Sequence, residues 1–179
     1  MRLRGGISAL FLAAILAAIL AAETRGLWLD VPFVKQTENG CGAAVLSMTM
    51  QYWLRQGATL NPRDIDAARI QGELYSAELH GILASQMQQY LENHGFQALA
   101  FRGRWDDLSQ QLAKGRPLIV AMHSGGESHY VVIAGMSGEV VEMNDPADRK
   151  LRKIGRAEFE KKWRAAENWT LLAVPRPLS

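Results

Sequence analysis

Cysteine and net charge are both scarce in this chain, and each absence excludes a class of function. Cys41 is the one cysteine among 179 residues, so neither a disulfide framework within the chain nor a zinc site of the CxxC type can form. Of the 20 basic and 18 acidic residues, Arg2 and Arg4 precede the first acid, Glu23, which leaves 18 of each sign from there onward. A body without net charge gives no electrostatic reason to expect nucleic acid or an anionic membrane surface as a partner.

A long apolar run lies near the amino terminus. Residues 7–22 read ISALFLAAILAAILAA, follow the two arginines and are followed at once by the polar ETRG. The run has 16 residues, fewer than the roughly 20 that a membrane-spanning helix needs. We predict that residues 1–22 are a signal peptide cleaved near Ala22 or, because Leu20 is larger than the small residue that such a cleavage site prefers, an uncleaved anchor. Both versions predict export to the periplasm or the extracellular space, with membrane contact only through an uncleaved segment.

The first half of the remaining chain has helical periodicity. Apolar residues recur at helical spacing from Cys41 onward, and the pattern stops at Gly57. Asn61, as a helix cap followed by proline, predicts a second helix that runs through DIDAARI. A third, amphipathic helix is predicted over residues 82–94, where Gly95 ends it. The cysteine therefore stands where a loop becomes a helix.

Strand patterns dominate after Gly95. The predicted strands are 27–34, 97–101, 117–122, 129–136, 139–145, 149–154 and 169–174, with short helices at 105–115 and 158–163. A Ser-Gly turn signal at 137–138 joins two of these strands in a hairpin. The whole pattern indicates one α+β domain over residues 27–175, with a helical first half and an antiparallel sheet.

A cysteine at the start of a helix has help in becoming a nucleophile. The unpaired N–H groups of the first turn and the positive end of the helix dipole favour the thiolate of Cys41. Gly42 leaves the backbone of that turn uncrowded, so the backbone N–H of Cys41 is placed to face a developing oxyanion. Gln36, in the loop before the helix, has a side-chain NH2 group that offers a second donor to the same oxyanion.

His129 and Asp145 are the predicted partners of the thiol. His129 opens one strand of the hairpin and Asp145 closes the other, so antiparallel pairing predicts that the two side chains lie nearly opposite each other. His123 is a rival base, but it ends a strand with no acid placed opposite it. Asn144 is the alternative to Asp145 as the group that orients the imidazole, and alternation along the strand puts these two residues on opposite faces.

The other candidates for ligand binding form no recognisable site. His80 and His94 lie on or next to the third helix, without a cysteine partner or the spacing of a zinc site. The five tryptophans are interpreted as packing residues rather than as a platform for a sugar or a nucleotide. We therefore expect neither a metal nor a cofactor.

Three segments of the chain resemble a known family. QTENGCGAAVLSM, followed far downstream by HYVVIAG and then NDP, resembles the peptidase C39 family and its C39-like relatives among the papain-like cysteine peptidases. The resemblance extends over about residues 29–174 and implies a papain-like fold. It also implies that Cys41 is the nucleophile and that His129 acts as general base and then as general acid. In the same way, Asp145 would orient the imidazole and Gln36 would donate to the oxyanion.

The resemblance has two departures from the family pattern. Exporter-associated members are amino-terminal domains of ABC transporters and act in the cytoplasm on leader peptides that end in Gly-Gly, whereas this sequence has a predicted export signal. The second departure is Gly40, which stands where many members have Asp, so the capping of the cysteine helix is left open.

The sequence therefore predicts an exported cysteine peptidase. Its partner would be a peptide or protein substrate, either a leader of the Gly-Gly type or another exported protein. Two alternatives stay open: a catalytically silent C39-like module that binds a peptide or protein, and a cysteine amidase or transpeptidase of the same fold.

Overall fold

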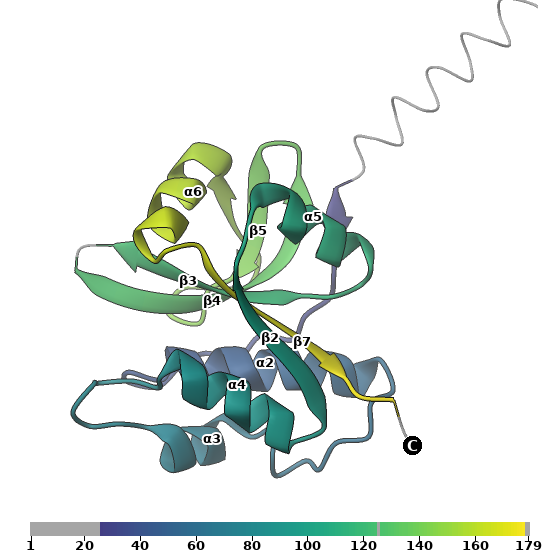
Figure 1. The fold of residues 1–179 in the computed structure, drawn as a ribbon, viewed down its shortest axis with the longest axis vertical. Coiled ribbons are helices and arrows are strands. Elements are labelled where there is room, and N and C mark those ends of the chain that lie inside the picture. The colour runs from purple at the N-terminus through teal and green to yellow at the C-terminus, as the bar shows by residue number, and fades with distance from the viewer. Residues whose placement is uncertain (1–25, 125, 178–179) are drawn as a thin grey trace, which may run out of the picture.

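Helices and one antiparallel sheet make up the computed structural model, which describes residues 26–124 and 126–177 (Figure 1). The elements in chain order are β1 (Leu27–Trp28), α2 (Cys41–Arg55), α3 (Ala67–Leu74), α4 (Ala84–Asn93), β2 (Phe96–Arg102), α5 (Trp105–Ala113), β3 (Leu118–Ser124), β4 (Glu127–Ser137), β5 (Val140–Asn144), β6 (Arg152–Gly155), α6 (Arg156–Ala165) and β7 (Trp169–Pro175). The predicted α+β architecture with a helical first half is confirmed. The predicted signal peptide at 1–22 lies outside the described residues, and no helix within them is long and apolar enough to cross a membrane.

The sheet has the strand order β2-β7-β3-β4-β5-β6, and β1 pairs with β4. Of the predicted strand 27–34, β1 alone pairs, and the rest is irregular. The predicted hairpin is formed by β4 and β5, and its turn includes Gly138 with a φ of 54°, in the left-handed region that suits glycine. The register of the hairpin shifts between Ile133 and Gly135, as in a β-bulge. This shift affects how the far ends of the two strands meet.

An apolar core lies on each face of the sheet. Helices α2, α3 and α4 pack with β2 and β7 over one core, and α5 and α6 cover the other (Figure 1). Side chains along β4 alternate between the two: Val132 and Ala134 belong to the first core, and Val131 and Ile133 to the second. Strand β4 is therefore held from both sides.

The second helix begins later than predicted. α3 starts after Asp66, whose Oδ1 accepts a hydrogen bond from the backbone N–H of Arg69 at 2.8 Å. Asn61 instead accepts a hydrogen bond from the backbone N–H of Arg63 at 3.0 Å, within a separate turn. Asparagine and aspartate are equally good helix caps, so the sequence offered two start signals, and the chain uses the second.

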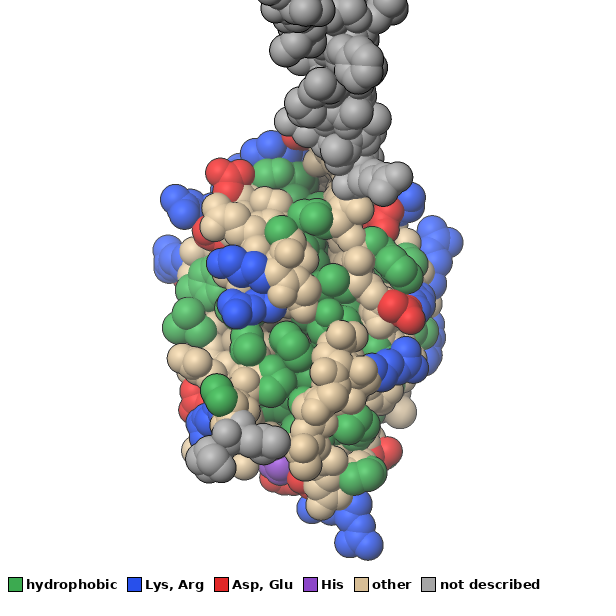
Figure 2. Space-filling model, turned by 90° about the vertical axis from the view of Figure 1, so that its right-hand side faces the viewer, with side chains coloured by type: hydrophobic (Ala, Val, Ile, Leu, Met, Phe, Trp, Pro, Cys, Tyr) green, Lys and Arg blue, Asp and Glu red, His purple; other side chains and the backbone are tan. Residues whose placement is uncertain are grey.

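Charged side chains of both signs are interspersed on the face of the molecule in Figure 2. Hydrophobic side chains gather over the centre of this face, with lysine, arginine and acidic side chains scattered around them. This distribution agrees with a chain whose basic and acidic residues nearly balance.

Candidate active site

Cys41 is the first residue of α2, and Gly40 before it has no side chain to cap the helix. A Cβ atom at Gly40 would lie 2.8 Å from Thr37 Oγ1 and 3.1 Å from the backbone N and O of Thr37. The turn that leads into the helix therefore has room for glycine, and an aspartate there would force it to move. The backbone N–H of Gly42, in the first turn, hydrogen-bonds the Cys41 sulfur.

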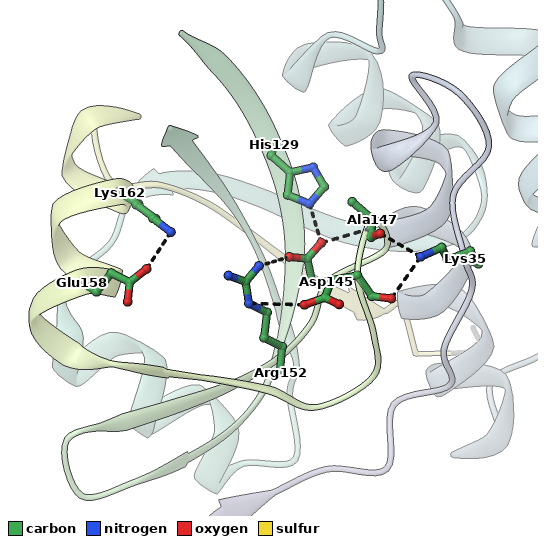
Figure 3. A network of polar contacts seen from close by, with 8 residues as sticks. Lys35, His129, Asp145, Ala147, Arg152, Glu158 and Lys162 are labelled. Atoms are coloured by element: carbon green, nitrogen blue, oxygen red, sulfur yellow. Dashed lines mark hydrogen bonds and ion pairs between the residues drawn. The ribbon is translucent and has the colours of Figure 1, made fainter. Parts of the chain in front are cut away.

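His129 and Asp145, which were predicted to lie nearly opposite each other, are diagonal neighbours across the β4–β5 pair. Asn144 pairs with Val132, which puts Asp145, one residue beyond β5, opposite Val131. His129 is two residues further along β4, on the same face of the sheet. The hairpin closes at Ser137 and Val140, a register that alone would put Asp145 opposite Val132. The register shift brings Asp145 one residue closer to His129 and onto its face of the sheet. The side chains still meet, because His129 Nε2 lies 2.7 Å from Asp145 Oδ1 (Figure 3).

Asp145 is a buried carboxylate with a hydrogen-bond donor on each oxygen. Its side chain is 3% exposed. Oδ1 also accepts a hydrogen bond from the backbone N–H of Ala147 at 3.1 Å, and Oδ2 accepts one from Arg152 Nη1 at 2.7 Å (Figure 3). Burial alone would raise the pKa of Asp145, but His129, Arg152 and the Ala147 N–H together lower it to about 2. Asp145 is therefore ionised at neutral pH.

Cys41 and His129 form a coupled pair. Burial would raise the pKa of Cys41, but hydrogen bonds from His129 and from the backbone N–H groups of Tyr130 and Gly42 lower it below its ordinary value. Burial would lower the pKa of His129, but Asp145 and the thiol raise it to about 9. Since Nε2 of the imidazole faces Asp145, Nδ1 is the ring nitrogen left for the thiol. At neutral pH these shifts favour a thiolate beside an imidazolium.

Gln36 lies in the loop that leads into α2, against the segment that follows β5. Its backbone N–H donates to the carbonyl oxygen of Pro146 at 3.1 Å. Next to it, Lys35 Nζ donates to the carbonyl oxygen of Ala147 at 2.8 Å (Figure 3). The side-chain Oε1 of Gln36 is buried and has no hydrogen-bond partner among the described residues. The amide of Gln36 therefore has hydrogen-bonding capacity that the described fold does not use.

The sequence matches the model of the Peptidase_C39 like family over residues 28–170. The chain belongs to this family. One curated relative is LagD of Lactococcus lactis, a lactococcin-G-processing and transport ATP-binding protein, with 30% identity over 144 residues, 80% of this chain and 18% of LagD. Another is the probable functional amyloid protease FapD of Pseudomonas aeruginosa, with 31% identity over 134 residues, 72% of this chain and 55% of FapD. The matched region is thus only part of each relative's length.

Solved structures of C39 and C39-like peptidases have the same fold. A double glycine motif protease from an AMS/PCAT transporter, solved in complex with the leader peptide, superposes with a TM-score of 0.64 at 25% identity, over 86% of this chain and 96% of that one. A C39-like peptidase from Bacillus anthracis superposes with a TM-score of 0.67 at 19% identity, over 86% of this chain and 100% of that one. The expected papain-like fold and the C39-like resemblance are confirmed.

Within this C39-like domain, the alternative base His123 and the alternative orienting residue Asn144 lie on the opposite face of the sheet from His129 and Asp145. His123 pairs with Ser128 across β3 and β4, and its Nδ1 lies 3.3 Å from Ser128 Oγ. It neighbours Met122, the residue that pairs with His129, so the two histidines are on opposite faces. Asn144 is fully buried, and its Nδ2 donates to the carbonyl oxygens of the two residues at 31–32. Asn144 thus braces the segment before the cysteine loop and does not face the imidazole.

The other two histidines are not among the groups that act on the thiol. His94 Nδ1 lies 2.7 Å from the carbonyl oxygen of Tyr90 at the end of α4, and His80 is exposed in a loop. Among residues 26–124 and 126–177, no group of three or more His, Cys, Asp or Glu side chains is arranged to hold a metal ion.

Three contacts of the site were not anticipated from the sequence. They are the ion pair of Arg152 with Asp145, the N–H of Tyr130 at the sulfur, and the clamp from Lys35 to the segment after β5. The Arg152 contact had a signal, since residues 149–154 were predicted as a strand directly after the strand that ends at Asp145, and consecutive strands commonly pair. The other two depend on backbone groups, which every residue carries and no sequence pattern marks.

Proposed function

We propose that this chain is an exported cysteine peptidase that hydrolyses peptide bonds with Cys41 as nucleophile. His129 is the general base and acid, Asp145 orients its imidazole, and Gln36 donates a hydrogen bond to the oxyanion. The observation that carries the proposal is the position of His129, between the only thiol of the chain and a carboxylate that is 3% exposed. Membership of a family of cysteine peptidases supports the same chemistry.

The first half of the reaction forms an acyl-enzyme. The Cys41 sulfur attacks the carbonyl carbon of the scissile amide, and the electron pair of the C=O bond moves to the oxygen. The amide N–H groups of Gln36 and of the Cys41 backbone hold this oxyanion. As the C–N bond breaks, His129 gives its proton to the leaving amine. A thioester on Cys41 and a neutral imidazole remain.

The second half releases the acyl group. The neutral imidazole of His129 takes a proton from water while the water oxygen attacks the thioester carbon. The C–S bond then breaks, which restores the thiolate and the imidazolium and frees a carboxylic acid. Asp145 stays ionised throughout, because its low pKa leaves it no proton to exchange at working pH.

Relatives suggest the class of substrate. The transporter-derived relative was solved with a leader peptide and is described as a double glycine motif protease, and FapD is described as a protease of functional amyloid. We propose that the substrate here is a peptide or protein of the export route, with a leader ending in Gly-Gly as the first candidate. Its cleavage would leave the Gly-Gly carboxylate on the leader and a new amino terminus on the cargo.

Thiol reactivity tests the proposal without knowledge of the substrate. At about pH 6 a free thiol with a pKa of about 8.5 is almost wholly protonated, whereas Cys41 beside His129 should be alkylated by iodoacetamide far faster than a free thiol. Cys41→Ala gives the blank, because no other cysteine exists in the chain. Alkylation of native Cys41 no faster than free cysteine would contradict the proposal.

A comparison of cleavage products tests the reaction itself. Wild type and Cys41→Ala are incubated separately with Gly-Gly leader peptides and with exported proteins, and new amino termini are identified by mass spectrometry. We expect new termini with the wild type and none with Cys41→Ala. Identical peptide sets would favour a module that binds peptide without cutting it, and a product joined to an added amine would favour a transpeptidase.

The cellular location of the protein is tested separately. The full chain is expressed in a bacterial host, the cells are fractionated, and the amino terminus of the exported protein is sequenced. We expect a mature chain that begins near Glu23, or an intact chain in the membrane fraction if the segment is an anchor. An intact chain in the cytoplasm would contradict export and would leave the peptidase proposal standing.

A further inference from the structure

Arg152 holds the oxygen of Asp145 that His129 does not use. Its Nη1 lies 2.7 Å from Asp145 Oδ2, and His129 Nε2 lies 2.7 Å from Asp145 Oδ1 (Figure 3). The carboxylate is therefore fixed at both ends of its O–C–O group. A carboxylate held at one oxygen alone can turn about its Cβ–Cγ bond, and this one cannot turn without breaking an ion pair.

The sheet register explains why Arg152 reaches this carboxylate. Arg152 opens β6 and pairs with Met143 of β5. Paired residues share a face, and Asp145 lies two residues beyond Met143 on that face. The guanidinium is thus a diagonal neighbour of Asp145 on one side, as His129 is on the other. His129, Asp145 and Arg152 come from β4, the end of β5 and β6, which are adjacent strands, and lie in one row across the sheet.

The ion pairs of the Arg152 guanidinium are with acids of the loop that carries Asp145. Arg152 Nε lies 3.6 Å from Asp148 Oδ2, so the side chain spans both acids of the segment 145–148. Glu158, in the first turn of α6, accepts a hydrogen bond from Lys162 Nζ at 2.7 Å (Figure 3). The Arg152 side chain is 33% exposed against 3% for Asp145, so the arginine is the partner of this ion pair that faces solvent.

We propose that Arg152 is a positioning residue of the active site: by binding Oδ2 of Asp145 it keeps Oδ1 directed at His129 Nε2. The inference rests on the proposed function, since it assigns Arg152 a role in the same Cys-His-Asp arrangement. Arg152 touches neither the sulfur nor the reacting bond in this role, and it acts through Asp145 alone.

Substitution of Arg152 has two possible effects of opposite sign, and this makes the proposal testable. If Arg152 positions Asp145, Arg152→Met weakens the His129–Asp145 hydrogen bond, the pKa of His129 falls, and the thiolate is less favoured. If Arg152 supplied only a positive charge, its removal would instead favour the imidazolium and raise the pKa of His129. The direction of the shift therefore separates positioning from simple charge.

The experiment measures the rate of Cys41 alkylation by iodoacetamide across a pH series. For Arg152→Met we expect the acid limb to move to higher pH and the rate at about pH 6 to fall about tenfold, the effect of one hydrogen bond between charged groups. Arg152→Lys should restore part of the rate, because it keeps the charge but loses the planar fork. An unchanged profile, or a limb moved to lower pH, would overturn the proposal.

Two controls distinguish positioning from a general loss of structure. Lys153→Met removes the neighbouring cation on β6, whose Nζ lies 3.0 Å from Glu142 Oε1, and should keep the wild-type profile. In an Asp145→Ala background, Arg152→Met should cause no further change, because the residue through which it acts is gone. An equal loss in both backgrounds would refute action through Asp145.

The same series separates the two levels of inference. If wild-type Cys41 is no more reactive than a free thiol, the proposed function fails, and the role of Arg152 fails with it. If the wild type is reactive and Arg152→Met equals it at every pH, the inference about Arg152 alone is wrong.

Discussion

His129 interacts with two partners, and each of them carries a negative charge opposite to that of the imidazolium. On one side it approaches a thiol whose pKa is lowered, and on the other it bonds a carboxylate whose pKa is lowered to about 2. Burial works against all three charges, so each depends on its neighbour in the row as well as on the N–H groups and the Arg152 guanidinium around it. The chemistry at the scale of single residues is therefore a property of the row Cys41, His129 and Asp145, and a change at one end should be felt at the other.

The pH dependence of activity should reflect the titration of Cys41 and His129 in this row. Activity requires the thiolate and the imidazolium together, so kcat/KM should rise as Cys41 loses its proton and fall as His129 loses its own near pH 9. Asp145→Asn removes the carboxylate charge that helps raise the pKa of His129, so the basic limb should move to lower pH. A pH–rate profile of both proteins checks this, and a basic limb that stays in place in Asp145→Asn would contradict it.

Gln36 should affect the transition state and not the thiol. Gln36→Ala should lower kcat by about 10²- to 10³-fold, the usual effect of losing one oxyanion donor, because the negative charge on the substrate oxygen exists only during reaction. Steady-state kinetics should show a nearly unchanged KM, and iodoacetamide should alkylate Cys41 at the wild-type rate.

Gln56→Ala is the matched control for this prediction. Gln56 is exposed at the opposite end of α2, so its loss should leave kcat unchanged. A loss of thiol reactivity in Gln36→Ala would mean that Gln36 shapes the cysteine loop instead of binding an oxyanion.

At the scale of elements, the end of β5 performs two tasks with two neighbouring residues. Alternation turns Asp145 toward His129 and Asn144 toward the opposite face. Asn144 is 0% exposed, and its Oδ1 also accepts a hydrogen bond from the backbone N–H of Leu151 at 3.0 Å. One strand end thus places the carboxylate and ties down the loop around it.

Asn144→Ala should loosen that strand end. The substitution leaves two buried carbonyl groups and one partly buried N–H without their partner, so we expect a loss of about 1 to 3 kcal/mol in the free energy of unfolding. Urea unfolding followed by circular dichroism measures this loss. Asn93→Ala, at an exposed position on α4, should have little effect, and equal midpoints for both variants would show that the buried amide does not brace the loop.

The sequence alone was sufficient for those parts of the site that depend on local signals. A helix start predicted the place of Cys41, and a turn with strand alternation predicted His129 beside Asp145, since each of these signals is carried by neighbouring residues. That the thiol meets this pair was implied by the family resemblance. The diagonal offset of His129 was not predicted, because the turn of the hairpin lies at residues 138–139, one residue later than the Ser-Gly signal at 137–138. Arg152 was missed because its role depends on pairing between strands, and Asn61 was taken for a cap because Asp66, five residues later, carries the same chemistry.

At the scale of the whole molecule, one sheet serves as a wall for both cores. Side chains of β4 enter the two cores alternately, so neither core can be disrupted without displacing a strand that the other core needs. The site lies where this shared strand begins. We therefore expect the domain to unfold as one unit.

Substitutions in the two cores should lower the same transition. Met48, in the first core, and Met143, in the second, are both fully buried, so Met48→Ala and Met143→Ala should each cost about 2 to 5 kcal/mol. In each variant, tryptophan fluorescence and circular dichroism should report one coincident midpoint during urea unfolding. Two separated transitions in either variant would show that the cores unfold independently.

The hydrogen bond between the cysteine loop and the segment after β5 bears on when the site can form during synthesis. The bond from Lys35 to Ala147 joins residues 112 positions apart, and His129, Asp145 and Arg152 are all in the later part of the chain. Chains are synthesised from the amino terminus, so the thiol emerges long before its base, its carboxylate or the clamp exists. On the proposed mechanism, Cys41 would be an ordinary thiol until synthesis has passed Arg152, and a nascent or unfolded copy would cut nothing, itself included. Completion of the fold would then be the activation step.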